Sequence, residues 1–281
     1  MLRQRIIAGV SAVIILAAAV SADIFLKKFL FFNLFISLCA VLCAVEICGL
    51  LKKNSRMTPP VPVLISFSAV APLLLTFMIH LGKVQQGVTL LLPIFILFML
   101  TLLLYQWRFG DRESYLLNTG MACVAFFIIS LPAVSLILIP TLAGGGNVKQ
   151  GCFAVFVTIL TVKMYDIGAY TGGKNFGRTK IFPVLSPKKS LEGCISGLVF
   201  SVTAAVLLGT VFHQMFLVSV AILFGLVAGI IGQTGDLAES ALKRTLNIKD
   251  SGSSIPGFGG VLDLVDSILG FAPVSLLFFL I

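Results

Sequence analysis

Long apolar stretches separated by short polar segments run along the whole chain. Each stretch is close to the roughly 20 residues that a helix needs to cross the hydrocarbon core of a membrane. There are nine such stretches: residues 6–26, 29–51, 61–82, 86–105, 116–143, 152–172, 193–212, 214–235 and 261–281. The pattern predicts an all-α, polytopic membrane protein with about nine transmembrane helices.

The first stretch has two interpretations. Arg3 and Arg5 precede an apolar run that ends in Ala-Val-Ser-Ala before Asp23, as in a cleavable signal peptide. The run is long, however, and eight further stretches follow it. We therefore expect a retained first helix.

Composition supports the membrane assignment. Of the 281 residues, 58% are hydrophobic and only 11% are charged, whereas a soluble domain carries about a quarter charged residues. This shortage of charge excludes a cytosolic enzyme, a nucleic-acid-binding module and a disordered regulator. The six cysteines all lie in or beside apolar runs and form no CxxC pair, so we expect them to be packing residues and not a disulfide frame or a metal site.

The formal net charge is +9, and the positively charged residues are distributed unevenly between the two sides of the membrane. If the N-terminus is cytoplasmic and the sides alternate, 15 of the 20 Lys and Arg residues fall on the cytoplasmic side. The exceptions are Lys27, Lys28, Lys83 and Lys149 on the other side and Lys163 within a stretch. Because cytoplasmic loops of membrane proteins collect Lys and Arg, this distribution predicts a cytoplasmic N-terminus and places the two most polar loops, 173–192 and 236–260, in the cytoplasm.

The acidic residues divide the chain into two regions. Residues 1–150 hold four of the 11 acids, and residues 151–281 hold seven, several of them inside or at the ends of stretches. Ionisable groups within a membrane are energetically costly and mark functional sites by default. We therefore expect N-terminal transmembrane helices over 1–150 and a C-terminal catalytic region over 151–281. Glu46, a lone acid in the second stretch, is expected to have a helix-end or packing role.

A first polar cluster occurs near the end of the sixth stretch. Lys163, Asp166 and Tyr170 follow one another at intervals of three and four residues, which places them on one face of a helix. The cluster is consistent either with a buried ion pair that joins two helices or with a functional site.

A second cluster is the basic, glycine-bearing loop that follows. It resembles a P-loop up to Lys174, but Asn175 stands at the Ser/Thr position and no strand precedes it, so a P-loop is rejected. The loop continues through Ser186-Pro-Lys188-Lys189-Ser190 into a helix that carries Glu192 in its first turns. Lysines and helix N-termini suit phosphate groups, although a basic loop lying on anionic lipid explains the composition equally well.

The third cluster is the strongest. Asp236, Glu239, Ser240 and Lys243 lie at positions i, i+3, i+4 and i+7, which form one polar stripe on a helix. The chain then passes through a glycine-rich turn into a last helix that opens with Asp263 and Asp266 on one face. Carboxylates from two helix ends, flanked by Lys and Arg, form an arrangement that can hold Mg²⁺ and a polyphosphate.

These residues resemble the phosphatidate cytidylyltransferases, also called CDP-diacylglycerol synthases. The family signature places Ser, Lys-Arg, Lys-Asp, Pro-Gly-His-Gly-Gly and Asp-Arg-x-Asp at fixed spacings. The matching positions are Ser240, Lys243, Arg244, Lys249, Asp250, Pro256, Gly257, Gly259, Gly260, Asp263 and Asp266. Segments around Asp166, 186–193 and 235–240 also resemble family blocks. There are two departures, because Phe258 replaces the family's His and Leu264 replaces its Arg.

The resemblance implies the reaction of CTP with phosphatidic acid to give CDP-diacylglycerol and pyrophosphate, with Mg²⁺ as cofactor. It implies Asp236 and Asp263 as metal ligands, and these two with Lys243 and Arg244 as the catalytic residues. The implied substrate-binding residues are Ser186, Lys188, Lys189, Ser240, Lys249, Asp166 and Asp266. The resemblance also suggests a homodimer, and the absence of an organellar-type transit segment suggests a bacterial inner membrane.

Three other functions stay open. A CTP-dependent lipid kinase would use a lipid alcohol in place of phosphatidic acid. An ion-coupled transporter would use Lys163, Asp166, Asp236 and Asp263 as a relay, although no internal repeat is visible. An inactive family member would be explained by Phe258 and Leu264.

Overall fold

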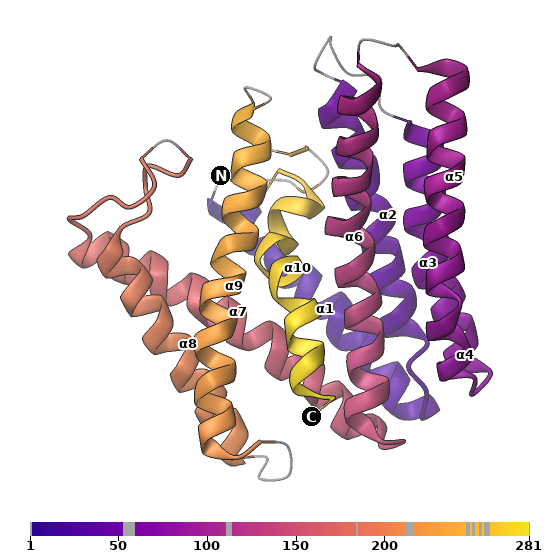
Figure 1. Cartoon of the computed structure of the whole chain (residues 1–281). Helices are drawn as coiled ribbons and strands as arrows, with labels where there is room; N and C mark the ends of the chain where they lie inside the picture. Colours follow the sequence, from indigo (N-terminus) through magenta and orange to yellow (C-terminus); the bar gives the residue numbers. More distant parts are fainter. Residues whose placement is uncertain are drawn as a thin grey trace.

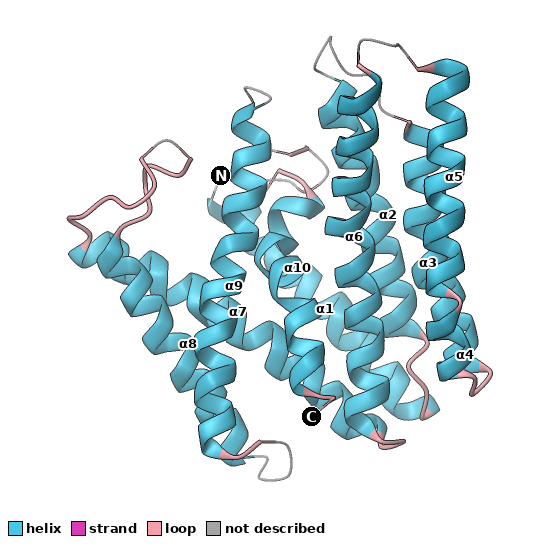
Figure 2. Ribbon diagram, in the orientation of Figure 1, coloured by secondary structure: helices cyan, strands magenta, loops and turns pink. Residues whose placement is uncertain are grey.

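The computed structural model describes residues 2–52, 60–110, 114–183, 185–211, 216–245, 248, 251–252, 255 and 259–280. Side chains of residues 2–10, 12, 210 and 211 are outside this description. The described part of the chain is helical, as Figure 2 shows, apart from loops and two isolated β-bridges that pair Lys180 with Ser190 and Ile255 with Gly259. The all-α prediction is confirmed.

Ten helices follow one another along the described chain. They are α1 (Leu2–Leu26), α2 (Phe31–Lys52), α3 (Val61–His80), α4 (Val84–Thr89), α5 (Leu91–Phe109), α6 (Tyr115–Gly144), α7 (Val148–Phe176), α8 (Leu191–Val211), α9 (Val218–Thr245) and α10 (Val261–Phe278). In Figure 1, α2, α3, α5 and α6 stand on one side, α7, α8 and α9 on the other, and α10 between them.

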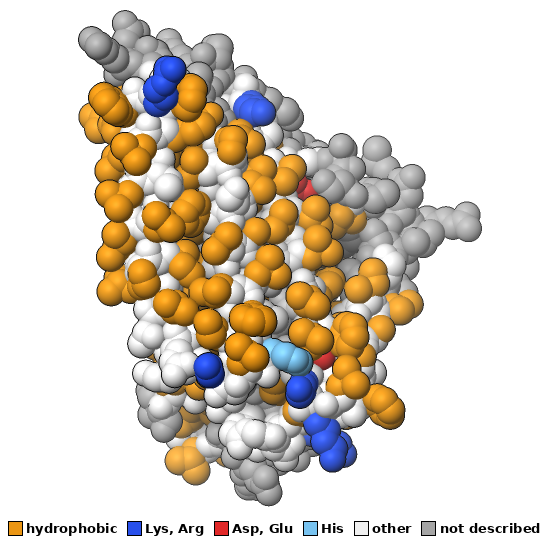
Figure 3. All heavy atoms as spheres, turned by 90° about the vertical axis from the view of Figure 1, so that its right-hand side faces the viewer, with side chains coloured by type: hydrophobic (Ala, Val, Ile, Leu, Met, Phe, Trp, Pro, Cys, Tyr) orange, Lys and Arg blue, Asp and Glu red, His pale blue; other side chains and the backbone are white. Residues whose placement is uncertain are grey.

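Eight segments of the described chain are long and apolar enough to cross a membrane, α4 and α5 together making one of them. The protein is thus an integral membrane protein. The remaining predicted stretch, residues 6–26, corresponds to α1, of which Val13–Leu26 is a shorter apolar helix. Figure 3 shows one face on which hydrophobic side chains cover the middle, while Lys and Arg side chains lie toward its upper and lower ends, as expected of a lipid-facing surface.

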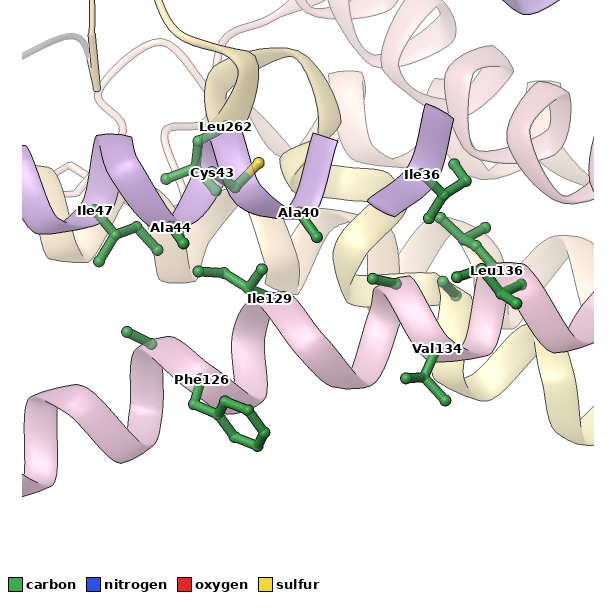
Figure 4. Close-up of a cluster of buried hydrophobic side chains, with 14 of the residues drawn as sticks. Ile36, Ala40, Cys43, Ala44, Ile47, Phe126, Ile129, Val134, Leu136 and Leu262 are labelled. Carbon is green, nitrogen blue, oxygen red and sulfur yellow. The ribbon is translucent and has the colours of Figure 1, made fainter. Parts of the chain in front are cut away.

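The main core lies where α2 packs against α6. Figure 4 shows Ile36, Ala40, Ala44 and Ile47 along one face of α2 opposite the α6 side chains, with Leu262 of α10 beside Cys43. Two small residues between two branched ones on this face of α2 allow the two helices to interlock. This core fixes α10, whose first residues belong to the third polar cluster.

The helices α7 and α8 approach closely because each carries glycines four residues apart. A Cβ at Gly168 would lie 2.7 Å from Phe200, and one at Gly197 would lie 2.8 Å from the Tyr165 ring. Such small-residue spacing is the usual way for membrane helices to pack. It holds the loop between α7 and α8 close to the end of α9.

The end of α9 lies beyond the predicted apolar stretch 214–235. Residues 236–245, which begin the predicted polar loop 236–260, continue α9 as helix, as the polar stripe predicted. The stripe of Asp236, Glu239, Ser240 and Lys243 supplies side-chain contacts one helical turn apart, which favour continued helix. The predicted division at residue 150 falls in the first turn of α7.

Candidate active site

The candidate site is built where α9 crosses α10. At the crossing Gly235 faces Gly270, and a Cβ on either residue would lie 3.0 Å from the other's Cα. The two backbones can meet this closely only because both positions lack a side chain. The crossing brings Asp236 of α9 and Asp266 of α10 into one cluster.

Three carboxylates form that cluster. Asp236, Glu239 and Asp266 each offer an oxygen, and these oxygens all lie within 4.8 Å of one another. Glu239 is 7% exposed, and among the described residues neither of its oxygens receives a directed hydrogen bond, although the Lys243 ammonium lies 3.2 Å from one of them. Since a buried carboxylate is costly without partners, this group could hold a metal ion.

Asp263 has different surroundings. One carboxylate oxygen accepts a hydrogen bond from Lys243 Nζ at 2.7 Å. The other accepts from Ser251 Oγ at 2.6 Å and from the backbone N–H of Gly260 at 2.7 Å. Both oxygens are therefore occupied by protein donors. Asp263 caps the start of α10 and orients Lys243.

The metal pair of Asp236 and Asp263 stays a prediction, and Asp263 is not a member of the three-carboxylate cluster. Asp236 clusters instead with Glu239 and Asp266. Sequence reasoning placed Glu239 on the polar stripe and Asp266 among the substrate-binding residues. It expected carboxylates of these two helix ends to act together, but which of them lie nearest one another depends on the glycine crossing.

The first polar cluster joins the same site from α7. Lys163 Nζ lies 3.1 Å from Asp166 Oδ2 and donates to Ser267 Oγ at 2.9 Å. Ser267 Oγ in turn donates to Asp166 at 3.0 Å. Because Ser267 follows Asp266 directly, this ion pair stands beside the three-carboxylate cluster. Tyr170, predicted on the same face, is 68% exposed.

The loop between α7 and α8 contributes one lysine directly. Lys189 Nζ lies 2.7 Å from Asp236 Oδ2. The loop is held in place because the Glu192 carboxylate accepts hydrogen bonds from the backbone N–H groups of Arg178 and Thr179. Ser190 caps α8 by accepting from the N–H of Gly193 at 3.3 Å.

The other predicted residues lie around this network. Ser240 Oγ donates to Asp236 at 3.4 Å, and Arg244 Nε donates to the Leu185 carbonyl at 3.5 Å. Ser186 takes part through its backbone, which accepts from Lys189 N–H. Lys188 is exposed, and Lys249 lies outside the described residues.

Glu46 is a residue whose position sequence reasoning did not foresee. Its two oxygens accept hydrogen bonds of 2.9 Å from the backbone N–H groups of Val261 and Leu262. It therefore caps α10 from α2, across more than 200 positions of sequence. The expected helix-end role holds, but the helix end belongs to α10.

The formal charge of the site is negative. Five carboxylates and three ammonium groups contact one another here, which leaves a formal charge of −2. They are Asp166, Asp236, Glu239, Asp263, Asp266, Lys163, Lys189 and Lys243. One divalent cation would neutralise this excess.

Comparison with known proteins identifies the family. Residues 3–281 match the profile of the Cytidylyltransferase family. The chain belongs to this family. A phosphatidate cytidylyltransferase of Staphylococcus aureus (strain COL) is 32% identical over 266 residues, covering 92% of this chain and 94% of that protein.

Two further matches are shorter. The uncharacterized protein YnbB of Escherichia coli (strain K12) is 35% identical over 173 residues, which cover 60% of this chain and 56% of YnbB. A phosphatidate cytidylyltransferase of Bacillus subtilis (strain 168) is 38% identical over 125 residues, 44% of this chain and 46% of that protein. The predicted family resemblance is confirmed.

Proposed function

We propose that the protein transfers the cytidylyl group of CTP to phosphatidic acid. A phosphate oxygen of the lipid attacks the α-phosphorus of CTP, the bond between the α- and β-phosphates breaks, and CDP-diacylglycerol and pyrophosphate are formed. The observation that carries the proposal is the network of acids and lysines at the crossing of α9 and α10, in a chain that belongs to the Cytidylyltransferase family.

The nucleophile needs no general base, because a lipid phosphate is already anionic at neutral pH. Rate enhancement then depends on alignment and on neutralising charge at the phosphates. Lys189 and Lys243 are the ammonium groups of the network that can pair with the triphosphate. Their carboxylate partners, Asp236 and Asp263, lie 2.7 Å from them.

We assign Mg²⁺ to the cluster of Asp236, Glu239 and Asp266. The group fits a hard cation because all its ligand atoms are carboxylate oxygens, and because Glu239 is buried and receives no directed hydrogen bond from the residues that the structure describes. Bound there, Mg²⁺ would neutralise phosphate charge. Asp263 acts in this proposal by orienting Lys243, which replaces its predicted role as a ligand.

The membrane setting matches two substrates of opposite solubility. We propose that CTP arrives from the cytoplasm through the loop between α7 and α8, and that the lipid enters sideways from the cytoplasmic leaflet of a bacterial inner membrane. The count of Lys and Arg supports this orientation.

Pyrophosphate release by the detergent-purified protein tests the proposal. Given CTP, phosphatidic acid and Mg²⁺, the protein should form pyrophosphate and CDP-diacylglycerol in equal amounts, and omission of any one component should stop the reaction. Asp236→Asn should lower the rate about 10²–10³-fold, the usual cost of removing one charge contact at a reacting group.

Other products would contradict this reaction. Formation of CDP with a phosphorylated lipid alcohol would indicate a lipid kinase, and ion flux without pyrophosphate would indicate a transporter. Phe258 lies outside the described residues, and the activity of a Phe258→His variant should be compared with that of the parent protein. An inactive parent and an active variant would indicate a site that has lost activity by drift.

A further inference from the structure

Two apolar grooves flank α10 in the described structure. One, of about 440 Å³, lies between α6, α9 and α10 and includes Leu131, Ala238, Glu239 and Asp266. The other, of about 830 Å³, lies between α1, α2, α6, α7 and α10. We call the larger one the α2–α10 groove; its walls include Cys39, Ala40, Leu136, Lys163, Leu264 and Ile268.

The α2–α10 groove has the length of one lipid leaflet. Its lining runs from Phe35 to Cys43 on α2 and from Val261 to Leu269 on α10. Eight residues of helix rise about 12 Å, and half of a hydrocarbon core is about 15 Å thick. The groove can therefore enclose most of one acyl chain within a single leaflet.

Charge distinguishes the two grooves. The smaller groove is lined by two carboxylates, Glu239 and Asp266, and by no cation among its described residues. The α2–α10 groove is lined by Lys163, whose ammonium lies 2.9 Å from Ser267 Oγ. The α2–α10 groove therefore offers an ammonium that an anionic lipid can reach by taking the place of Asp166 as its partner, whereas the carboxylates of the smaller groove repel an anion.

Position 264 adds a second observation. Leu264 stands where the family signature has Arg, and it lines the same groove as Lys163. It precedes Ser267 by three residues, so both face one side of α10, and Ser267 is the residue to which Lys163 donates. The cation on this wall thus comes from α7, while position 264 of α10 is apolar.

We propose that the α2–α10 groove binds one acyl chain of an anionic glycerolipid and that Lys163 binds the lipid's phosphate in place of an arginine at position 264. This inference rests on the proposed function for the identity of the lipid. It adds a specific lipid site, a residue that recognises its charge and a basis for selecting chain length.

Filling the groove tests the acyl-chain site. Cys39→Trp places a large side chain in the groove, and Val45→Trp, on the exposed face of the same helix, is the matched control. Cys39→Trp should raise KM for dioleoyl phosphatidate at least tenfold and leave KM for dihexanoyl phosphatidate and for CTP within twofold. Val45→Trp should leave all three within twofold. Equal effects of the two variants, or of Cys39→Trp on both lipids, would overturn the proposal.

Exchanging the cation tests the role of Lys163. Lys163→Met should raise KM for phosphatidate at least tenfold and leave KM for CTP unchanged. In the double variant with Leu264→Arg, at least half of this increase in log KM for phosphatidate should be reversed. Ser267→Ala, which removes the hydrogen bond but keeps the charge, should have a smaller effect than Lys163→Met. A double variant no better than Lys163→Met would refute the exchange.

A binding measurement separates this inference from the proposed reaction. Phosphatidate with a photoreactive diazirine in its acyl chain should label residues of the α2–α10 groove, identified by mass spectrometry, whether or not pyrophosphate is released. Labelling of Leu131 and Ala238 in the smaller groove instead would overturn the site. Labelling as expected without turnover would keep the site and contradict the reaction.

Discussion

Asp263 and Asp266 lie about one turn apart at the start of α10, but they meet different neighbours. Asp263 accepts hydrogen bonds from Lys243, Ser251 and the Gly260 N–H, so its charge is compensated within the protein. Asp266 lies in a cluster with two other carboxylates, where like charges repel one another until a cation binds. The first carboxylate therefore stabilises the fold, and the second is available for a ligand.

Amide substitution should separate these two roles. Asp263→Asn leaves one acceptor oxygen where two were used and turns an NH₂ group toward donors, so unfolding free energy should fall by about 1–3 kcal/mol. Asp266→Asn relieves repulsion and should leave stability unchanged or higher. Both should lower pyrophosphate release about 10²–10³-fold. Thermal unfolding in detergent without Mg²⁺ is the measurement. Equal destabilisation by both variants would contradict a repulsive cluster.

For single residues, the sequence predicted contacts along one helix better than contacts between helices. The spacing of Asp236, Ser240 and Lys243 placed them on one stripe because a helix has a fixed period. The pairing of Asp263 with Ser251 and the convergence of Asp266 on Asp236 depend on how α9 crosses α10. No local pattern encodes that crossing, although Gly235 and Gly270 permit it.

Two helices have their N-termini capped by a carboxylate from another part of the chain. Asp23 accepts hydrogen bonds from the first N–H groups of α2 at residues 30, 31 and 32, and Glu46 does the same for α10. Each carboxylate satisfies orphan donors and the positive end of the helix dipole. The two caps are alike in chemistry, but only α10 carries Asp263 and Asp266.

Because the two caps are alike, Asp23→Asn and Glu46→Gln are a matched pair of variants. Each should lower unfolding free energy by about 1–2 kcal/mol, because a charge at a helix N-terminus is lost in a partly buried setting. Glu46→Gln should also reduce turnover several-fold, whereas Asp23→Asn should leave turnover unchanged. Unfolding in detergent and pyrophosphate release measure the two effects. A kinetic defect in Asp23→Asn of the same size would show that stability alone controls the rate.

The crossing of α9 and α10 predicts the effect of a single side chain. Gly270→Val would place its Cβ 3.0 Å from the Gly235 Cα and from the Ile231 carbonyl, so the helices must separate or the variant must misfold. We expect loss of at least 10²-fold in turnover together with lower thermal stability. Gly120→Ala on α6 is the control, because a Cβ there meets nothing within 4 Å and alanine favours helix by about 0.5–1 kcal/mol. Normal turnover in Gly270→Val would show that the close crossing is dispensable.

For the whole molecule, the sequence predicted the spans well, because membrane thickness fixes the length of an apolar helix. The predicted stretch 29–51, for example, is α2, and 116–143 is α6. It could not predict that α10 packs between the two groups of helices, since hydrophobicity alone does not choose neighbours among apolar helices. Packing of small residues makes that choice, as at Gly235 and Gly270, where α9 meets α10.

The uneven distribution of Lys and Arg predicts which side of the membrane the site faces. In a variant without the native cysteines, Lys188→Cys should react with a membrane-impermeant maleimide only in inside-out vesicles, and Lys83→Cys only in intact cells. Lys83 is the control for accessibility, because both positions are exposed. The reverse result would place the site outside the cytoplasm and contradict the route proposed for CTP.

The Glu46 cap has a consequence for how such a protein can evolve. The polar chemistry is concentrated after residue 150, which suggests a portable module that could be joined to any set of membrane anchors. Yet α10, the helix that carries Asp263 and Asp266, has its N-terminus capped by the Glu46 carboxylate of α2. A chimaera that joins residues 151–281 to the first half of a distant homologue should lose function when the donor lacks an acid at the position of Glu46. If that loss is observed, the two halves must be inherited together.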